Sequence, residues 1–226
     1  MIMNEEIRLD SFEQFFDGIK NIWARLEQPN RIIPFCTPLM LNPTFLVIGT
    51  NHSNNFCPYN ETENNRIADA YSSEIPKEHT FLEHQHPFAT ALRRIITGVR
   101  EEIKDFDINE EWLGTNRCAI QTDSDGIANL KRHVNYKDCE KEMDLLLKAF
   151  VRYMQPKNVL LTGEHACQLY YSKGPMQGMK SKKCILSKES RDTFNLIPVK
   201  HLSMGYHKSE IIRKIKESIN DGFCDY

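Results

Sequence analysis

The sequence predicts an α/β protein of three layers, α/β/α, in which helices cover both faces of a central, mostly parallel, four-stranded sheet. Short apolar runs alternate with longer segments of helical periodicity along the 226 residues, and this alternation is typical of parallel sheets. The clearest apolar runs contain no polar residues at alternate positions, as expected for strands buried on both faces. No repeat or linker divides the chain, so we expect a single domain over residues 1–226.

Amphipathic helices are predicted where apolar residues recur every three or four positions. Ser11 and Gln14 fit a capping box for the first helix. Pro87 stands where a helix favours proline, in its first turn. The predicted helices span residues 11–27, 87–103, 138–154 and 206–220, with a shorter helix over 163–170.

Strands are predicted where short runs are wholly apolar, at residues 45–48, 159–161 and 196–199. Residues 112–120, in which polar residues interrupt the apolar ones, are a further strand candidate. The first run ends at Gly49, where we expect the strand to break into a polar turn. Residues 1–42 are then an N-terminal helix and lead-in, and 43–216 form the core of the fold. Residues 51–80 are polar and lack periodicity, and so long a segment inside a compact domain is more often functional than idle.

Composition indicates a globular cytoplasmic protein. Hydrophobic residues make up 40% and charged residues 27% of the chain, and no apolar run approaches the roughly 18 residues that span a membrane. The acidic N-terminus lacks the layout of a signal peptide. The seven cysteines form no C-x-x-C pair, and the histidines form no H-x-x-x-H pair with a third ligand. We therefore expect no disulfide framework, no metal site and no other cofactor.

Charge is divided unevenly along the chain. Residues 151–226 contain 13 basic and 7 acidic residues, whereas the rest of the chain contains 16 and 24. The basic residues gather in 173–191 and recur at Lys200, Lys208 and Arg213. Such a face could neutralise phosphates, although most charge runs are simply solvated surface.

Two polar segments follow buried strands, and open α/β sheets bind ligands at the carboxyl ends of their strands. After the first strand, Gly49 allows the backbone to approach a ligand closely, and Asn51 could hold a water; an Asn-rich turn is the alternative. After the last strand, His201 could stabilise a developing anion. Met204 could act as a wedge between bases, or both could be packed structural residues.

Five segments, in order, resemble motifs of the uracil-DNA glycosylase superfamily over residues 43–216. The first resembles the Gly-x-Asn motif of the mismatch-specific, Asn-based branch, and the last resembles the superfamily's His-Pro-Ser motif. Between them lie counterparts of a His-Pro segment, of a middle strand whose Asn reads the base edge, and of a third strand with a Gly-x-x-Ala turn. The segments are Gly49-Thr50-Asn51, His86-Pro87-Phe88, Thr115-Asn116, residues 156–166 and His201-Leu202-Ser203.

The chain also departs from the superfamily pattern. The strongest uracil enzymes place Asp where Asn51 stands, so this general base is absent. His52 and Leu202 replace the prolines of the two motifs. Ser53 takes the place of the Tyr that blocks pyrimidines substituted at carbon 5, and it leaves space for such a substituent.

The resemblance implies hydrolysis of the N-glycosidic bond of a flipped nucleotide, without a cofactor. Asn51 would orient the water and His201 would hydrogen-bond the base oxygen as charge builds. Asn116 would read the Watson–Crick edge, unless Gln121 or Asp123 does so. The implied substrate pocket is Gly49, Thr50, His52, Ser53, Phe56 (or Tyr59) and Asn116, and the implied DNA contacts are Gly163, Lys200, Ser203, Met204 and His207.

Our hypothesis is therefore a monomeric DNA glycosylase, acting on duplex or single-stranded DNA, that accepts a bulky C5-modified cytosine. Hydroxymethylated or glucosylated cytosine would fit the space at Ser53, and such bases occur in phage genomes, which suggests a role in defence. One alternative is a uracil or mismatch repair glycosylase. Others are a catalytically silent DNA-binding homologue, and an unrelated nucleotide or sugar hydrolase on a similar sheet.

Overall fold

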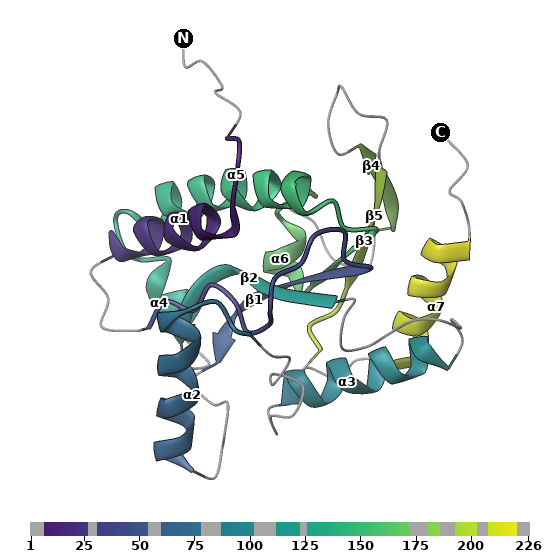
Figure 1. Ribbon diagram of the computed structural model, residues 1–226, viewed down its shortest axis with the longest axis horizontal. Helices are drawn as coiled ribbons and strands as arrows, with labels where there is room; N and C mark the ends of the chain where they lie inside the picture. The colour runs from purple at the N-terminus through teal and green to yellow at the C-terminus, as the bar shows by residue number, and fades with distance from the viewer. Residues whose placement is uncertain are drawn as a thin grey trace.

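The computed structural model of the chain describes residues 7–26, 31–53, 60–77, 87–101, 112–122, 126–171, 180–185, 193–202 and 208–220. For residues 51–53, 122, 126–127 and 219–220 it describes the backbone only. The described residues form a central, mostly parallel sheet with helices on both of its faces (Figure 1). The predicted α/β class is confirmed.

The sheet has five strands in the order β2-β1-β3-β5-β4, so the prediction of four strands is wrong. The additional strand, β4, pairs antiparallel with β5 at the edge of the sheet, whereas the other pairs are parallel. It is short, and three of its four residues are exposed, so it carries no apolar run that a pattern search would detect. The strands are β1 (Phe45–Ser53), β2 (Trp112–Thr122), β3 (Asn158–Thr162), β4 (Lys182–Ile185) and β5 (Thr193–Val199).

Strand β1 is longer than predicted, because it does not break at Gly49. It continues to Ser53, with Gly49 opposite Asn116 and Asn51 opposite Cys118 of β2. The register then shifts, and His52 lies opposite Gln121. Backbone pairing with β2 therefore holds a polar segment in extended form where its sequence favours a turn.

Apart from the short α4, which was not predicted, the helices agree with the sequence pattern except in the polar segment. There α2 begins after Asn60, whose side chain accepts a hydrogen bond from the Glu63 backbone, and it buries only Ile67, Ala68 and Tyr71. So narrow an apolar face leaves a weak periodicity, which explains why the helix was not predicted. None of the described helices is long and apolar enough to cross a bilayer. The helices are α1 (Phe12–Ala24), α2 (Glu61–Ser73), α3 (Pro87–Arg100), α4 (Gly126–Leu130), α5 (Tyr136–Met154), α6 (Glu164–Cys167) and α7 (Lys208–Asn220).

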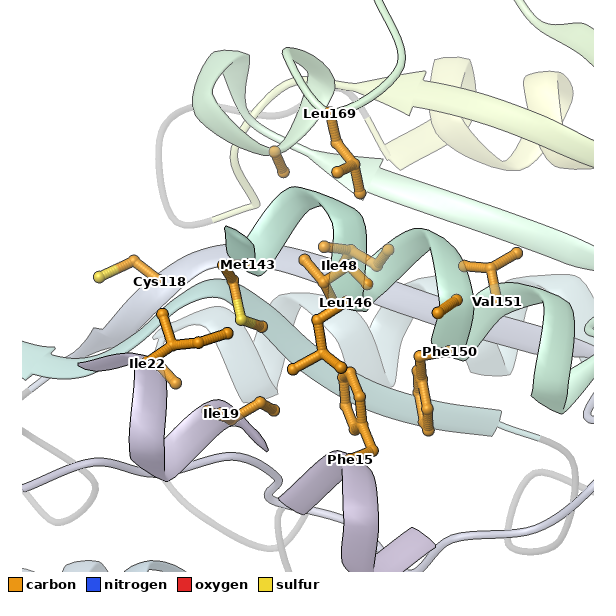
Figure 2. Close-up of a cluster of buried hydrophobic side chains, with 14 of the residues drawn as sticks. Phe15, Ile19, Ile22, Ile48, Cys118, Met143, Leu146, Phe150, Val151 and Leu169 are labelled. Carbon is orange, nitrogen blue, oxygen red and sulfur yellow. The ribbon is translucent and has the colours of Figure 1, made fainter. Parts of the chain in front are cut away.

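Each face of the sheet is covered by its own hydrophobic cluster. In β1, Leu46 and Ile48 belong to the cluster with α1 and α5, whereas Phe45 and Val47 belong to the cluster with α3 and α7. This division follows from the two-residue period of a strand. Figure 2 shows the first cluster, in which side chains of α1 and α5 meet below Ile48. At its centre the rings of Phe15 and Phe150 stack with centroids 3.9 Å apart.

The outer edge of β2 is covered by the lead-in segment. Isolated antiparallel bridges join Ile32 to Ile120 and Phe35 to Thr115. The Thr115 hydroxyl also donates to the Pro34 carbonyl at 2.9 Å. Backbone groups that an edge strand would otherwise expose to a neighbouring chain are partly satisfied within the molecule.

Helices α3 and α7 pack closely where Gly98 faces Ile212. A Cβ atom on Gly98 would overlap Ile212 Cδ1, so we predict that Gly98→Ala destabilises the protein. Overpacking costs about 1–3 kcal/mol, which exceeds the gain of about 1 kcal/mol from the better helix propensity of alanine. The free energy of unfolding in urea measures the effect.

Ile212→Val removes the atom that would be overlapped, so it should relieve the strain. We expect the free energy of unfolding of the double variant to be about 0.5–1 kcal/mol higher than the value obtained by adding the effects of the two single changes. Strict additivity of the two free-energy changes would contradict the proposed packing.

Candidate functional site

The order of the strands creates a switch point at β1. The chain passes from β1 to β2 on one side, and later returns to β3 on the other side of β1. Segments that leave the carboxyl ends of these strands therefore depart to different sides, and ligands of open α/β sheets bind in the crevice that results. The candidate site lies at this edge.

At this edge Asn116 lies against the backbone of Gly49. A Cβ atom on residue 49 would overlap Asn116 Oδ1, and it would lie 3.7 Å from Thr162 Oγ1 of β3. The Thr162 hydroxyl is buried and donates to the Ile48 carbonyl at 3.3 Å. An amide and a hydroxyl from the strands on either side of β1 are thus brought together by the absence of a side chain at residue 49.

Gly163 makes a second close approach, directly after β3. Its φ of 90° favours glycine, and its backbone N–H donates to the Val199 carbonyl at 2.9 Å. A Cβ atom there would lie 3.0 Å from Thr50 Oγ1 and 3.2 Å from His201 Cδ2. The turn therefore joins the ends of β1, β3 and β5.

His201 is partly buried beside the first turn of α3. Its ring centroid lies 5.7 Å from that of Phe88, with the planes inclined at 54°. Burial lowers the pKa of His201 below its ordinary value of 6.5, so the imidazole is neutral at neutral pH. A neutral imidazole donates one hydrogen bond and accepts another.

The structure therefore places five of the predicted site residues in two adjoining contacts, which are Gly49 with Asn116 and Gly163 with Thr50 and His201. Lys200 precedes His201 and is exposed. Asn51, His52 and Ser53 continue β1 beyond Gly49, and only their backbone is described. Phe56, Ser203, Met204 and His207, with the alternatives Tyr59 and Asp123, lie outside the described residues.

Gln121, the remaining alternative to Asn116, is buried farther along β2. Its backbone N–H donates to the Arg31 carbonyl at 2.9 Å, and it lies opposite His52. Its place in the strand is thus fixed by the lead-in segment. Asn116, opposite Gly49, is the residue that meets the other strand ends.

Behind the site lies a buried ion pair that we did not predict. Arg117, next to Asn116 in β2, is 4% exposed and forms two parallel hydrogen bonds of 2.7 Å with the Asp144 carboxylate of α5. Its Nη1 also donates to the His165 carbonyl of α6 at 2.8 Å. Arg117 therefore ties β2, α5 and the segment after Gly163 together. A charged residue inside a buried strand needs a partner. Arg117 in the predicted strand 112–120 was therefore the signal in the sequence that such an ion pair exists.

His165 completes this network. Its Nε2 lies 2.8 Å from Glu140 Oε1 and 3.3 Å from the Tyr136 hydroxyl, while Nδ1 is buried without a hydrogen-bond partner among the described residues. We therefore assign the tautomer that carries the proton on Nε2. The hydrogen bond from His165 lowers the pKa of Glu140 to about 2, and burial lowers the pKa of His165.

The groups that converge at the edge can recognise a polar ring and stabilise an anion. They are the Asn116 amide and the neutral His201 imidazole, with Phe88 as an apolar neighbour. The hydroxyls of Thr50 and Thr162 donate to the backbone carbonyls of Thr162 and Ile48. Among the described residues no three His, Cys, Asp or Glu side chains are grouped so as to hold a metal ion. No family model matches the chain, and no curated protein matches it in sequence.

We predict that Gly49→Ala displaces the Asn116 side chain and leaves the fold intact, because the atom that would be overlapped is the end of a partly exposed side chain. Gly114→Ala in β2 is the matched control, since its Cβ would make ordinary contacts at 3.4 Å or more. The Asn116 side-chain amide resonances in NMR spectra should shift in the first variant only. Equal shifts in both variants would contradict the close approach.

A second prediction concerns acid. The lowered pKa values of Glu140 and His165 contribute stability that is present above their unfolded values, near 4.5 and 6.5, and is lost as the pH falls toward the folded values. The melting temperature of the wild type should therefore fall between pH 7 and pH 3. Glu140→Gln removes the carboxylate, so its melting temperature should fall less steeply between pH 5 and pH 3.

Asp138→Asn, at an exposed position of the same helix, is the control and should keep the pH dependence of the wild type. A Glu140→Gln variant with the same slope as the wild type would show that the carboxylate of Glu140 is not the group that titrates.

Proposed function

We propose that this chain is a DNA glycosylase that hydrolyses the N-glycosidic bond of a flipped, modified pyrimidine. The supporting observation is a pair of adjoining contacts: Asn116 lies against Gly49, and His201 lies against Gly163, which also approaches Thr50, the neighbour of Gly49. Gly49 and Asn116 lie opposite each other within β1 and β2, and His201 follows the end of β5. The same residues carry the resemblance to the uracil-DNA glycosylase superfamily, which requires their segments to lie near one another.

Bond cleavage would proceed through a sugar with oxocarbenium character and an anionic leaving base. The target nucleotide must first leave the base stack, at a cost of a few kcal/mol. The protein must then stabilise the separated charge and position a water. Asn51, two residues beyond Gly49 in β1, would orient that water through its amide.

His201 would donate a hydrogen bond to the oxygen of the departing base. Because burial keeps the imidazole neutral, the ring would act as a hydrogen-bond donor in a partly desolvated site, where such a bond is stronger than in water. Asn116 carries both donor and acceptor groups, which suits a Watson–Crick edge. Phe88, beside His201, would form an apolar wall of the site.

The proposed substrate is a cytosine with a bulky group at carbon 5, such as hydroxymethylcytosine or its glucoside. Ser53 supports this choice, because its small side chain replaces the tyrosine that excludes such groups in uracil-specific relatives. The substitution of Asn51 for aspartate favours one competing proposal, a catalytically silent DNA-binding protein. Uracil and mismatched thymine are the other substrates to be compared.

The test uses labelled duplexes that carry one uracil, one mismatched thymine, one hydroxymethylcytosine or one glucosylated hydroxymethylcytosine. Abasic products are revealed by alkali under single-turnover conditions. We expect cleavage of at least one modified duplex, and a rate lowered by about 10²-fold or more in Asn51→Ala and His201→Ala, as when a preorganised group that stabilises the transition state is removed.

Asn129→Ala, at an exposed position of α4, is the control and should retain the full rate. If folded wild-type protein yields no abasic product from any duplex, the glycosylase proposal is wrong.

A further inference from the structure

The cluster at the strand ends faces the side of the sheet covered by α3 and α7. Val47 and Leu160 belong to the hydrophobic cluster of that side, and Gly49 and Thr162 each follow one of them by two residues, so they face the same side. Phe88 of α3 is in contact with His201. A ligand bound beside His201 would therefore lie near the first turn of α3.

The balance of basic and acidic residues differs strongly between the helices on the two faces of the sheet. Helix α3 contains three arginines and no acidic residue, and α7 contains four basic and two acidic residues. The helices of the opposite face, α1 and α5, contain five basic and six acidic residues together. Of these helices, only α3 and α7 carry a positive charge that could attract phosphates.

Helix α2 packs in the same layer as α3 but is acidic. It contains three carboxylates and one arginine, and that arginine, Arg66, is paired with Glu63 at 2.6 Å. A second carboxylate of α2, Asp69, is paired with Arg31 at 2.6 Å. Phosphates are therefore attracted toward α3 and α7 and not toward α2.

The exposed side of α3 presents a row of groups suited to phosphate. Arg93, Arg94 and Arg100 are exposed. The Thr97 hydroxyl donates to the Arg93 carbonyl at 2.9 Å, and the Thr90 hydroxyl accepts from Arg93 at 3.5 Å. Arginines are common ligands of DNA backbone oxygens. From Phe88 to Arg100 the helix rises about 18 Å at 1.5 Å per residue, which corresponds to about five base pairs of duplex at 3.4 Å each.

Lys208, at the start of α7, extends this row. Its Cε would lie 3.2 Å from a Cβ atom on Gly98, so the lysine stem crosses the last turns of α3. We define the basic track as Arg94, Arg100, Lys200 and Lys208, all of which are exposed. It runs from Lys200, which precedes His201, along α3 to the start of α7. Figure 1 shows helices α3 and α7 side by side.

We infer that the basic track holds the phosphate backbone of the DNA that flanks the flipped nucleotide. This inference rests on the proposed function for the identity of the ligand, and it assigns the path of the duplex over α3 and α7. The opposite face with α1 and α5, and the acidic helix α2, remain clear of DNA.

The experiment measures binding of a fluorescein-labelled 20-base-pair duplex of unmodified DNA by anisotropy, over a series of salt concentrations. The track variant is Arg94→Gln/Arg100→Gln/Lys208→Gln. The control is Lys131→Gln/Lys137→Gln/Lys141→Gln, which removes the same charge from exposed positions in and beside α5. Melting temperatures verify that both variants are folded.

For the track variant we expect the slope of log K against log salt concentration to become shallower by about 0.9 for each phosphate that the protein no longer neutralises, or roughly 2 to 3 in total. The control should keep the slope of the wild type. Equal slopes for the track variant and the wild type, or equal changes in both variants, overturn the assignment of the track.

The two proposals fail in different ways. Abasic product with no effect of the track variant on binding overturns the track and leaves the glycosylase intact. Salt-dependent binding through the track without abasic product from any modified duplex supports the track and overturns the enzyme. In a cleaving protein, the track variant should raise the enzyme concentration needed for half-maximal rate and leave the saturated single-turnover rate unchanged.

Discussion

The close approach of Asn116 to the backbone of Gly49 is the constraint on which the candidate site depends. Parallel pairing puts these residues opposite each other in β1 and β2, and any side chain at residue 49 would occupy the place of the Asn116 amide. Gly163 repeats the arrangement at the end of β3, where Thr50 and His201 lie against its backbone. The site is thus shaped by two glycines that let side chains of neighbouring strands reach across the strand ends.

The strands and the turn must be held in place by other contacts, because the two glycines have no side chains that could do so. The Arg117–Asp144 pair provides such contacts. Burying two charges is costly, and the geometry must be good to offset the loss of hydration. Here the arginine makes two parallel bonds to the carboxylate and a further bond to the His165 carbonyl. The bonds fix β2 relative to α6, and therefore Asn116 relative to Gly163.

The sequence predicted the elements whose side chains are buried, because these elements contain clear apolar patterns. The cores of β1, β3 and β5 are apolar on both faces, so their runs were clear, whereas β4 is exposed and α2 buries only three residues. The polar half of β1 was mistaken for a turn because its extended form depends on pairing with β2. Gly49, Asn116 and His201 were proposed as site residues from motif order. Thr162 and Phe88 were not identified as site residues, because a threonine in an apolar strand and a phenylalanine on a helix face resemble ordinary core.

The distribution of charge along the sequence differs from its distribution in the folded molecule. Along the chain, the basic excess lies in residues 151–226, and α3 belongs to the acidic part. In the fold, α3 packs beside α7 through Gly98 and Ile212, and its three arginines join the basic residues of the C-terminal part. Helix α2, in the same layer, keeps the acidic character of the N-terminal part. The helical layer beside the candidate site therefore contains an acidic and a basic helix, and a polyanion bound there, as we propose, would be attracted toward α3 and α7 and repelled by α2.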